Sequence, residues 1–187
     1  PLLAFDEIDL EIVAQARHLH LASYYLLDHL RPDVPRLFRE ARRLGLSVSL
    51  DPNYDPSGEW DGGLRQALAL SDVFLPNQTE LLAISGSAGL RAGMDSLAAP
   101  GPLLAVKQGS QGACGLWQGQ FNQMPSLPVQ AVDTVGAGDG FAAVFMLGML
   151  LGWPVDDTLA RADTFARAGD DQGLKKFYLE KIAFFQN

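Results

Sequence analysis

The stretch DTVGAGDG at residues 133–140 leads directly into the apolar run FAAVFMLGMLL at residues 141–151. Residues 140–151 have the length and periodicity of a buried helix, so a glycine-rich loop opens onto a helix N-terminus. Glycines let the backbone approach a ligand closely, and unpaired amides at a helix start donate toward an anion. A carboxylate beside such an anion hole, here Asp139, can accept the proton of an attacking hydroxyl group. The stretch therefore predicts a phosphoryl-transfer site.

A second interpretation of the same loop stays open. Asp139 would then be only an N-cap or first-turn acid that the helix dipole favours, with the glycines forming a tight turn. Two familiar phosphate motifs are excluded by inspection, because no G-x-x-x-x-G-K-[ST] occurs and Phe141 stands where G-x-G-x-x-G needs its last glycine. P-loop and ordinary Rossmann sites are therefore disfavoured.

Short apolar runs alternate with longer amphipathic ones around this loop, which is the pattern of βαβ units feeding a mostly parallel sheet. The class is α/β. We expect strands at 19–23, 46–50, 73–75 and 103–107, helices at 34–44, 61–70 and 79–84, and an antiparallel hairpin built from 113–117 and 121–124. Gly45 is placed for a helix C-cap. Two polar motifs, Asp51-Pro52-Asn53 and Asn77, follow the carboxyl ends of strands.

The composition limits the domain organisation and the partners. The chain has 187 residues, 48% of them hydrophobic, which suffices for one globular domain, and no shift in composition marks a linker within residues 1–187. The net charge of −8 disfavours nucleic acid, because an extended phosphate backbone would be repelled. A small phosphorylated ligand is still compatible, since helix N-terminal amides bind phosphate without a basic surface.

The remaining general signals are weak. The N-terminal PLLAFDE lacks the basic flank and long apolar run of a signal peptide, and no apolar stretch is long enough to span a bilayer, so we expect a soluble cytoplasmic protein without a membrane partner. The one cysteine, Cys114, is expected to be a small core residue. His18 and His20 share one face of a strand but lack a third metal ligand, so we expect a structural role.

The loop and three further motifs together resemble the ribokinase-like, phosphofructokinase-B type carbohydrate kinases. The motifs are DPN at 51–53, PNQTE at 76–80, VKQGSQGA at 106–113 and DTVGAGDGF at 133–141, in the family's order and spacing over roughly residues 18–152. The resemblance implies a three-layer αβα fold and an ATP-dependent, magnesium-requiring kinase that phosphorylates a hydroxyl of a small sugar.

The resemblance also assigns the residues of the glycine-rich loop. Asp139 is implied to be the general base on the sugar hydroxyl, in contact with the substrate, and Gly136, Ala137 and Gly138 to supply the anion-hole amides. Thr134 is implied to lie at the nucleotide. The carboxylate of Asp133 and the carbonyl of Val135 resemble groups that hold a monovalent cation, potassium, although Asp133 capping the loop is the competing interpretation.

Two further motifs are implied to bind the nucleotide. Asn77 and Glu80 would act near magnesium and the phosphates, largely through ordered water. Lys107 with Gly109 and Gly112 would lie near ATP. The alternatives are a turn asparagine, an exposed helix glutamate and a simple charge at a strand end.

The substrate side is less determined. Asp51 and Asn53 are implied to face the phosphates and the sugar cleft, but Asp-Pro-Asn is also a common turn sequence. Trp60 follows in a loop bearing proline and glycine, and we expect it to be a packing anchor rather than a sugar-stacking platform.

The sequence departs from the family at both ends. Nothing before Pro1 corresponds to the family's N-terminal sugar-recognition segments and small β lid, so we expect a truncated chain, catalytically poor by itself, whose uncovered sheet invites a partner or a second copy as a homodimer. Residues 162–169 only loosely resemble the helix that lines the nucleotide. The tail at 170–187 matches nothing in the family, and we expect it to be an amphipathic helix.

Two rival functions remain beside the sugar kinase. One is a truncated or non-catalytic kinase half that binds nucleotide or works through a partner. The other is a kinase for a nucleoside or a vitamin-like alcohol, since the same fold and anion hole serve several acceptors.

Overall fold

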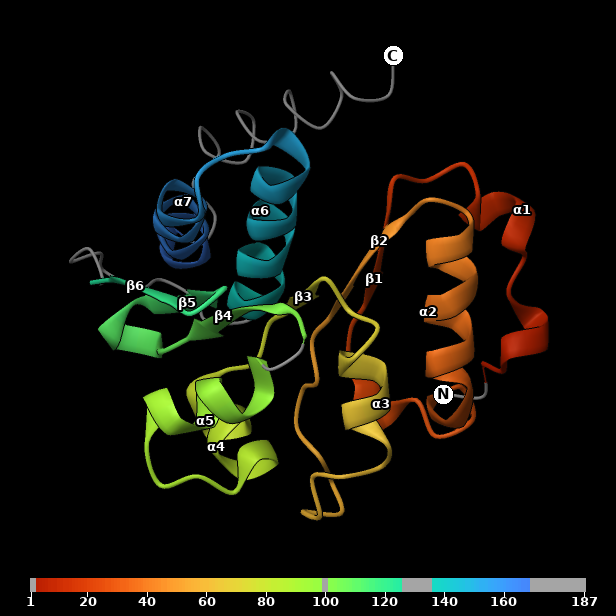
Figure 1. Cartoon of the computed structure of the whole chain (residues 1–187), viewed down its shortest axis with the longest axis horizontal. Coiled ribbons are helices and arrows are strands. Elements are labelled where there is room, and N and C mark those ends of the chain that lie inside the picture. Colours follow the sequence, from red (N-terminus) through yellow and green to blue (C-terminus); the bar gives the residue numbers. More distant parts are fainter. Residues whose placement is uncertain (1–2, 99–100, 126–135, 169–187) are drawn as a thin grey trace. The chain divides into compact units, whose positions relative to one another are not determined.

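The structure is a computed structural model that describes residues 3–98, 101–125 and 136–168 (Figure 1). The chain groups into two compact units. The first comprises Pro1–Val106 and Leu116–Gln120, and the second comprises Lys107–Gly115 and Phe121–Asn187. The organisation as one domain stays a prediction. Over the described part of the chain, no helix combines the length and apolar composition that crossing a bilayer needs.

Among the described residues, six strands form one sheet and follow one another in chain order. They are β1 (His18–Leu21), β2 (Ser47–Leu50), β3 (Val73–Phe74), β4 (Leu103–Lys107), β5 (Ala113–Trp117) and β6 (Gln120–Met124). The first four are parallel, with Leu21 opposite Leu50, Leu50 opposite Phe74 and Phe74 opposite Leu104. Central strands of such a sheet are buried on both faces, which is why β4 reads as a continuous apolar run. The predicted α/β class and mostly parallel sheet are confirmed.

The hairpin of β5 and β6 has a two-residue turn. Gln118 and Gly119 both have positive φ, at 50° and 81°. Two positive φ values define the type I′ turn, whose twist matches that of the flanking strands. The predicted antiparallel extension is therefore confirmed, with its second strand starting one residue earlier than expected.

Helices connect the strands of the first unit. They are α1 (Leu10–Val13), α2 (Val34–Arg43), α3 (Leu64–Leu68), α4 (Gln78–Ser85) and α5 (Leu90–Ala98), with 3-10 turns at Phe5–Glu7, Tyr24–Leu26 and Arg31–Asp33. Helix α2 buries Val34, Leu37, Phe38 and Ala41 at helical spacing and packs against β2. The helix ends at Arg43, Leu44 follows it, and Gly45 then takes a φ of 88° and donates its amide hydrogen bond to the Arg42 carbonyl, so the glycine terminates the helix as predicted.

The second unit contains a 3-10 turn at Gly109–Gln111 and two long helices, α6 (Ala137–Leu151) and α7 (Val155–Ala168), which lie side by side (Figure 1). Glycines allow the close packing of these helices. A Cβ added to Gly148 would lie 2.7 Å from Thr158, and one added to Gly140 would lie 3.1 Å from the ring of Phe165. Gly140 and Gly148 thus have a packing role in α6. Their low helix propensity, taken from the sequence alone, indicates only a weaker helix.

Several elements differ from the sequence predictions. Helix α6 begins at Ala137 rather than Gly140, because Gly136 takes the N-cap position with a φ of 79°. Helix α3 starts at Leu64 rather than residue 61, because Gly62 and Gly63 both have positive φ. Helix α5 was not predicted at all, since it contains Gly93, packed closely against Ser85 and Leu81 of α4.

Candidate functional site

Asp139 lies in the first turn of α6, three residues after the N-cap Gly136. The amide of Gly140 makes the first bond of the helix, to the Gly136 carbonyl at 2.8 Å. The amides of Ala137, Gly138 and Asp139 precede it and have no acceptor within the helix, and no side chain caps this end among the described residues. Asp139 itself is exposed. This end of the helix therefore presents donors and a carboxylate to solvent.

Lys107 belongs to the same unit and approaches this turn. A Cβ built on Gly138 would stand 3.7 Å from the Lys107 ammonium nitrogen, and no other heavy atom outside its own helix and chain neighbours lies within 4 Å of that point among the described residues. The strand-end lysine and the glycine-rich helix start, 31 positions apart in the sequence, are thus brought together. An ammonium group beside uncapped amides favours an anion electrostatically.

The turn after Lys107 is a closed loop of backbone hydrogen bonds. The amide of Gln108 donates to the Gly112 carbonyl at 2.8 Å, and the amide of Gly112 donates to the Gly109 carbonyl at 3.1 Å. Gly109 has a φ of 57° and Gly112 combines a φ of 95° with a ψ of −138°, a conformation that glycine adopts at low cost. The two glycines of the predicted nucleotide loop are therefore required by the shape of the turn.

In the first unit, Asp51 and Asn53 follow the carboxyl end of β2. Asp51 is buried, and its Oδ1 accepts from the Asn53 amide at 3.2 Å. Asn53 has a φ of 56°, and its side chain donates to Ser23 Oγ at 3.1 Å and accepts from the Tyr54 amide at 2.7 Å. The Asp-Pro-Asn sequence thus forms an ordered turn, and both side-chain polar atoms of Asn53 have partners, one of them in the loop after β1.

Asn77 and Glu80 form a reciprocal cap at the start of α4. Asn77 Oδ1 accepts from the Glu80 amide at 2.9 Å, and Glu80 Oε2 accepts from the Asn77 amide at 2.8 Å. Glu80 is only 7% exposed, so the alternative interpretation of an exposed helix glutamate is wrong. Since β2 and β3 are parallel, Asp51 and Asn77 follow strand ends at the same edge of the sheet.

The loop after Asn53 is ordered by a buried carboxylate. Asp55 accepts from the Ser57 amide at 2.9 Å, from Ser57 Oγ at 2.8 Å and from the Trp60 amide at 2.7 Å. Burial alone would raise the pKa of Asp55, but these hydrogen bonds hold that pKa below its usual value. The Trp60 ring packs edge-on against Tyr25 at 5.5 Å and Tyr54 at 5.8 Å, consistent with the predicted packing anchor.

The predicted site residues divide between the two units. Asp51, Asn53, Asn77 and Glu80 belong to the first unit, and Lys107, Gly109, Gly112 and the residues 136–139 belong to the second. That the two sets form one site stays a prediction. Asp133, Thr134 and Val135, with the predicted cation site, lie outside the described residues, as does the tail at 170–187.

A contact that the sequence reasoning missed lies beside the Gly109 turn. The guanidinium of Arg167 on α7 donates to the Gly109 carbonyl, and its Nε donates to Asp163 Oδ2 at 2.9 Å. The spacing of Asp163 and Arg167, four residues apart on a helix, is a recognised ion-pair signal. The partner 58 positions away has no such signal in the sequence.

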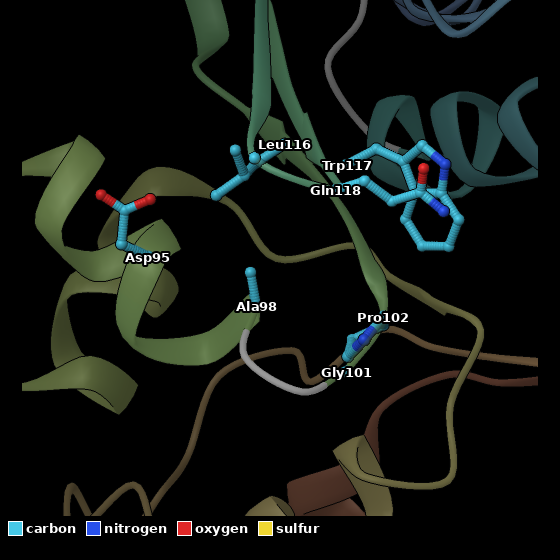
Figure 2. A pocket seen from close by; sticks show the side chains of 8 residues that line it. Asp95, Ala98, Gly101, Pro102, Leu116, Trp117 and Gln118 are labelled. Atoms are coloured by element: carbon cyan, nitrogen blue, oxygen red, sulfur yellow. The ribbon is translucent and has the colours of Figure 1, made fainter.

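A cavity of about 450 Å³ lies elsewhere in the first unit. Figure 2 shows Asp95 and Ala98 of α5 across from Trp117 and Gln118 at the end of β5, with Gly101, Pro102, Leu116 and Gly119 completing the lining. None of the predicted site residues that the structure describes lines it. We therefore place the candidate chemistry at the helix and strand ends described above rather than in this cavity.

Comparison with known proteins supports the same family. The ATP-dependent ribose-1-phosphate kinase of Halopiger xanaduensis is 36% identical over 164 residues, which cover 87% of this chain and 50% of that protein. A fructokinase of Klebsiella pneumoniae is 36% identical over 169 residues, covering 86% of this chain and 55% of that protein. The chain thus spans about half the length of these curated relatives.

Solved structures agree with the fold. A putative ribokinase II of E. coli, described in complex with ATP and Mg²⁺, has a TM-score of 0.78 at 24% identity and covers 98% of this chain and 63% of that one. A double mutant of the Vibrio cholerae fructokinase, described with fructose, ADP and potassium bound, has a TM-score of 0.67 at 25% identity and covers 80% and 51%. The predicted ribokinase-like fold is confirmed.

A model of the pfkB family of carbohydrate kinases matches residues 3–168, a range that contains every residue that the structure describes. With the uncapped glycine-rich start of α6, the relatives and the shared fold all in agreement, the chain belongs to the pfkB family of carbohydrate kinases.

Proposed function

We propose that this chain carries the nucleotide-binding and catalytic part of an ATP-dependent sugar kinase. The observation that carries the proposal is the start of α6, where an exposed carboxylate at Asp139 accompanies backbone amides that have no acceptor within the helix. The reaction forms a bond between an acceptor hydroxyl oxygen and the γ-phosphorus of ATP and breaks the bond to ADP. Asp139 takes the hydroxyl proton, and the Gly136–Gly138 backbone stabilises the charge on the transferred oxygens.

The neighbouring groups fit a phosphate ligand. The Lys107 ammonium lies where it can add a positive charge beside the helix start, and among the described residues outside α6 it is the only group within 4 Å of the position that a Gly138 Cβ would take. A side chain at Gly138 would stand between this ammonium group and the helix start. In an acidic chain of net charge −8, this local arrangement supplies the attraction for phosphate that the overall surface does not.

The residues of the first unit would serve the metal and the acceptor. We assign Glu80 and Asn77 to magnesium through water, because their reciprocal cap fixes a buried carboxylate in place. Magnesium bound to the ATP phosphates would neutralise charge there, as phosphoryl transfer requires. Asp51 and Asn53 would lie on the acceptor side, and Asp133 and Val135 would hold potassium, with Thr134, Gly109 and Gly112 near the nucleotide.

The acceptor is a small carbohydrate in this proposal. The two curated relatives act on different acceptors by their names, ribose 1-phosphate and fructose, so a panel of sugars is the appropriate probe. A nucleoside or vitamin-like alcohol is included in the panel, because the same anion hole serves any alcohol.

The test is ATP-dependent phosphorylation of this pooled panel, read by mass spectrometry, with Asp139→Asn beside the wild type. Asp157→Asn is the matched control, since Asp157 is also an exposed acid in the first turn of a helix in the same unit. We expect a product that disappears in Asp139→Asn, by at least about a hundredfold in rate, and persists in Asp157→Asn.

The other outcomes discriminate among the alternatives. A product that forms equally well in Asp139→Asn contradicts the role of the general base. No product from a chain that still binds Mg-ATP favours the non-catalytic kinase half. A wild-type chain that neither forms product nor binds Mg-ATP overturns the proposed site.

A further inference from the structure

Arg167 connects α7 to the Gly109 turn through two different donors. Its Nε donates to Asp163 Oδ2 at 2.9 Å, and its terminal nitrogen donates to the Gly109 carbonyl. The two charged side chains are only 17% and 8% exposed, so the pair is largely removed from water. Such a pair costs desolvation and is retained where its geometry is well satisfied. Here the second donor extends the pair to the backbone of a loop.

The acceptor of this contact is the carbonyl of Gly109, the first residue of the turn. The Gly109 carbonyl also accepts from the Gly112 amide at 3.1 Å, the bond that closes the 3-10 turn. Both glycines have positive φ. Because glycine can adopt many other backbone conformations, a turn with two glycines loses much conformational entropy when it is held in one shape. A guanidinium fixed on the same carbonyl therefore reduces the conformational freedom of the turn.

Only arginine has the shape for this double contact. The guanidinium is a rigid fork that donates from Nε and from its terminal nitrogens in different directions, whereas lysine carries a single compact ammonium. Asp163 occupies the Nε edge and leaves the terminal edge directed at Gly109. The pair thus orients the donor toward the loop, beyond adding charge.

We propose that Arg167, oriented by Asp163, is a positioning residue that holds the Gly109–Gly112 turn in the shape that receives the nucleotide. The inference rests on the proposed function for its nucleotide, because the turn follows Lys107, which reaches the anion-binding start of α6. Arg167 acts through the backbone of the turn and touches none of the reacting atoms in this proposal.

The test compares Arg167→Ala and Arg167→Lys with the wild type in two measurements. The first is the Kd for N-methylanthraniloyl-ATP with magnesium, by fluorescence. The second is hydrogen exchange of the Gln111 and Gly112 amides without nucleotide, which reports the turn by itself. Arg161→Ala is the control, since Arg161 lies on the same helix and stacks on Trp153, with its guanidinium carbon 4.8 Å from the ring centroid.

Both Arg167 variants are expected to raise the Kd about tenfold and to speed exchange at Gln111 and Gly112, because a charge-assisted hydrogen bond to the turn is lost. Arg167→Lys keeps a cation beside the buried Asp163. The lysine variant therefore keeps the inference testable if the alanine variant fails to fold. Arg161→Ala is expected to leave both measurements at the wild-type values.

The outcomes separate this inference from the proposed function. Wild-type exchange rates and Kd in Arg167→Lys would overturn the positioning role while the kinase proposal stands. Faster exchange in a chain whose wild type binds no nucleotide would support the clamp on the turn and refute the nucleotide site. Equal weakening of binding by Arg161→Ala would reduce the effect to loss of charge and also overturn the inference.

Discussion

The histidines of β1 form a polar network whose titration predicts a pH-dependent loss of stability. His18 Nδ1 lies 2.7 Å from Ser47 Oγ, and its Nε2 lies 2.7 Å from Ser49 Oγ, which is also 2.7 Å from His20 Nδ1. The two strands are parallel with His18 opposite Ser47, which places these side chains on one face. Burial of His18, and secondly the neighbouring His20, lower the pKa of His18 to about 4, while Asp72 opposes the shift.

The sign and size of the effect follow from linkage. The folded state binds a proton at His18 less readily than the unfolded chain, in which the pKa of His18 has the ordinary histidine value of 6.5. The stabilisation is therefore complete above about pH 6.5 and is lost as the pH falls from there toward about pH 4. For this shift the loss at pH 4.5 amounts to about 2.5 kcal/mol, a large part of the stability of an ordinary domain.

The measurement is urea unfolding of the wild type and His18→Gln at pH 7.5 and pH 4.5. Glutamine retains polar atoms for the serine hydroxyls and does not titrate, so its stability should fall by about 2.5 kcal/mol less between the two conditions. His29→Gln, at an exposed position, should keep the wild-type difference. Equal pH dependence of the wild type and His18→Gln, within about 0.5 kcal/mol, would refute the reasoning.

Two glycines of α6 give opposite predictions. Gly148→Ala gains about 1 kcal/mol of helix propensity but brings its Cβ to 2.7 Å from the buried Thr158, so we expect unfolding to become easier by about 1–2 kcal/mol in a urea titration. Ala143→Gly at an exposed position of the same helix measures the propensity contribution alone, and a stabilised Gly148→Ala would contradict the close packing. The Cβ of Gly138→Ala meets only an ordinary contact with Lys107, so we expect an unchanged melting temperature. We also expect at least about tenfold weaker binding of Mg-ATP, because the added methyl group keeps the ligand from approaching the backbone closely. Unaltered binding would argue against an anion in front of this turn.

Much of the fold was predictable because its signals are local. The apolar runs of β2 and β4 and the amphipathic pattern of α2 are carried by residues adjacent in the sequence, and Gly45 ends α2 as expected. Helix α5 was missed because the fold tolerates Gly93 for close packing against α4, a reason that no local pattern carries. Helix α6 starts earlier than predicted because Gly136 has a positive φ and takes the N-cap position. A loop with several glycines does not indicate which of them will do so.

The candidate site likewise has features that follow from local sequence and features that depend on tertiary packing. The sequence by itself determined the motifs, the family they indicate and the placement of Asp139 at a helix start, because glycine spacing and helix periodicity are properties of neighbouring residues. Only the tertiary structure decided that Glu80 is buried, that Lys107 reaches Gly138, and that Arg167 donates to Gly109. These features depend on segments distant in the sequence meeting in space, and the free energy that selects them exists only once the elements have packed.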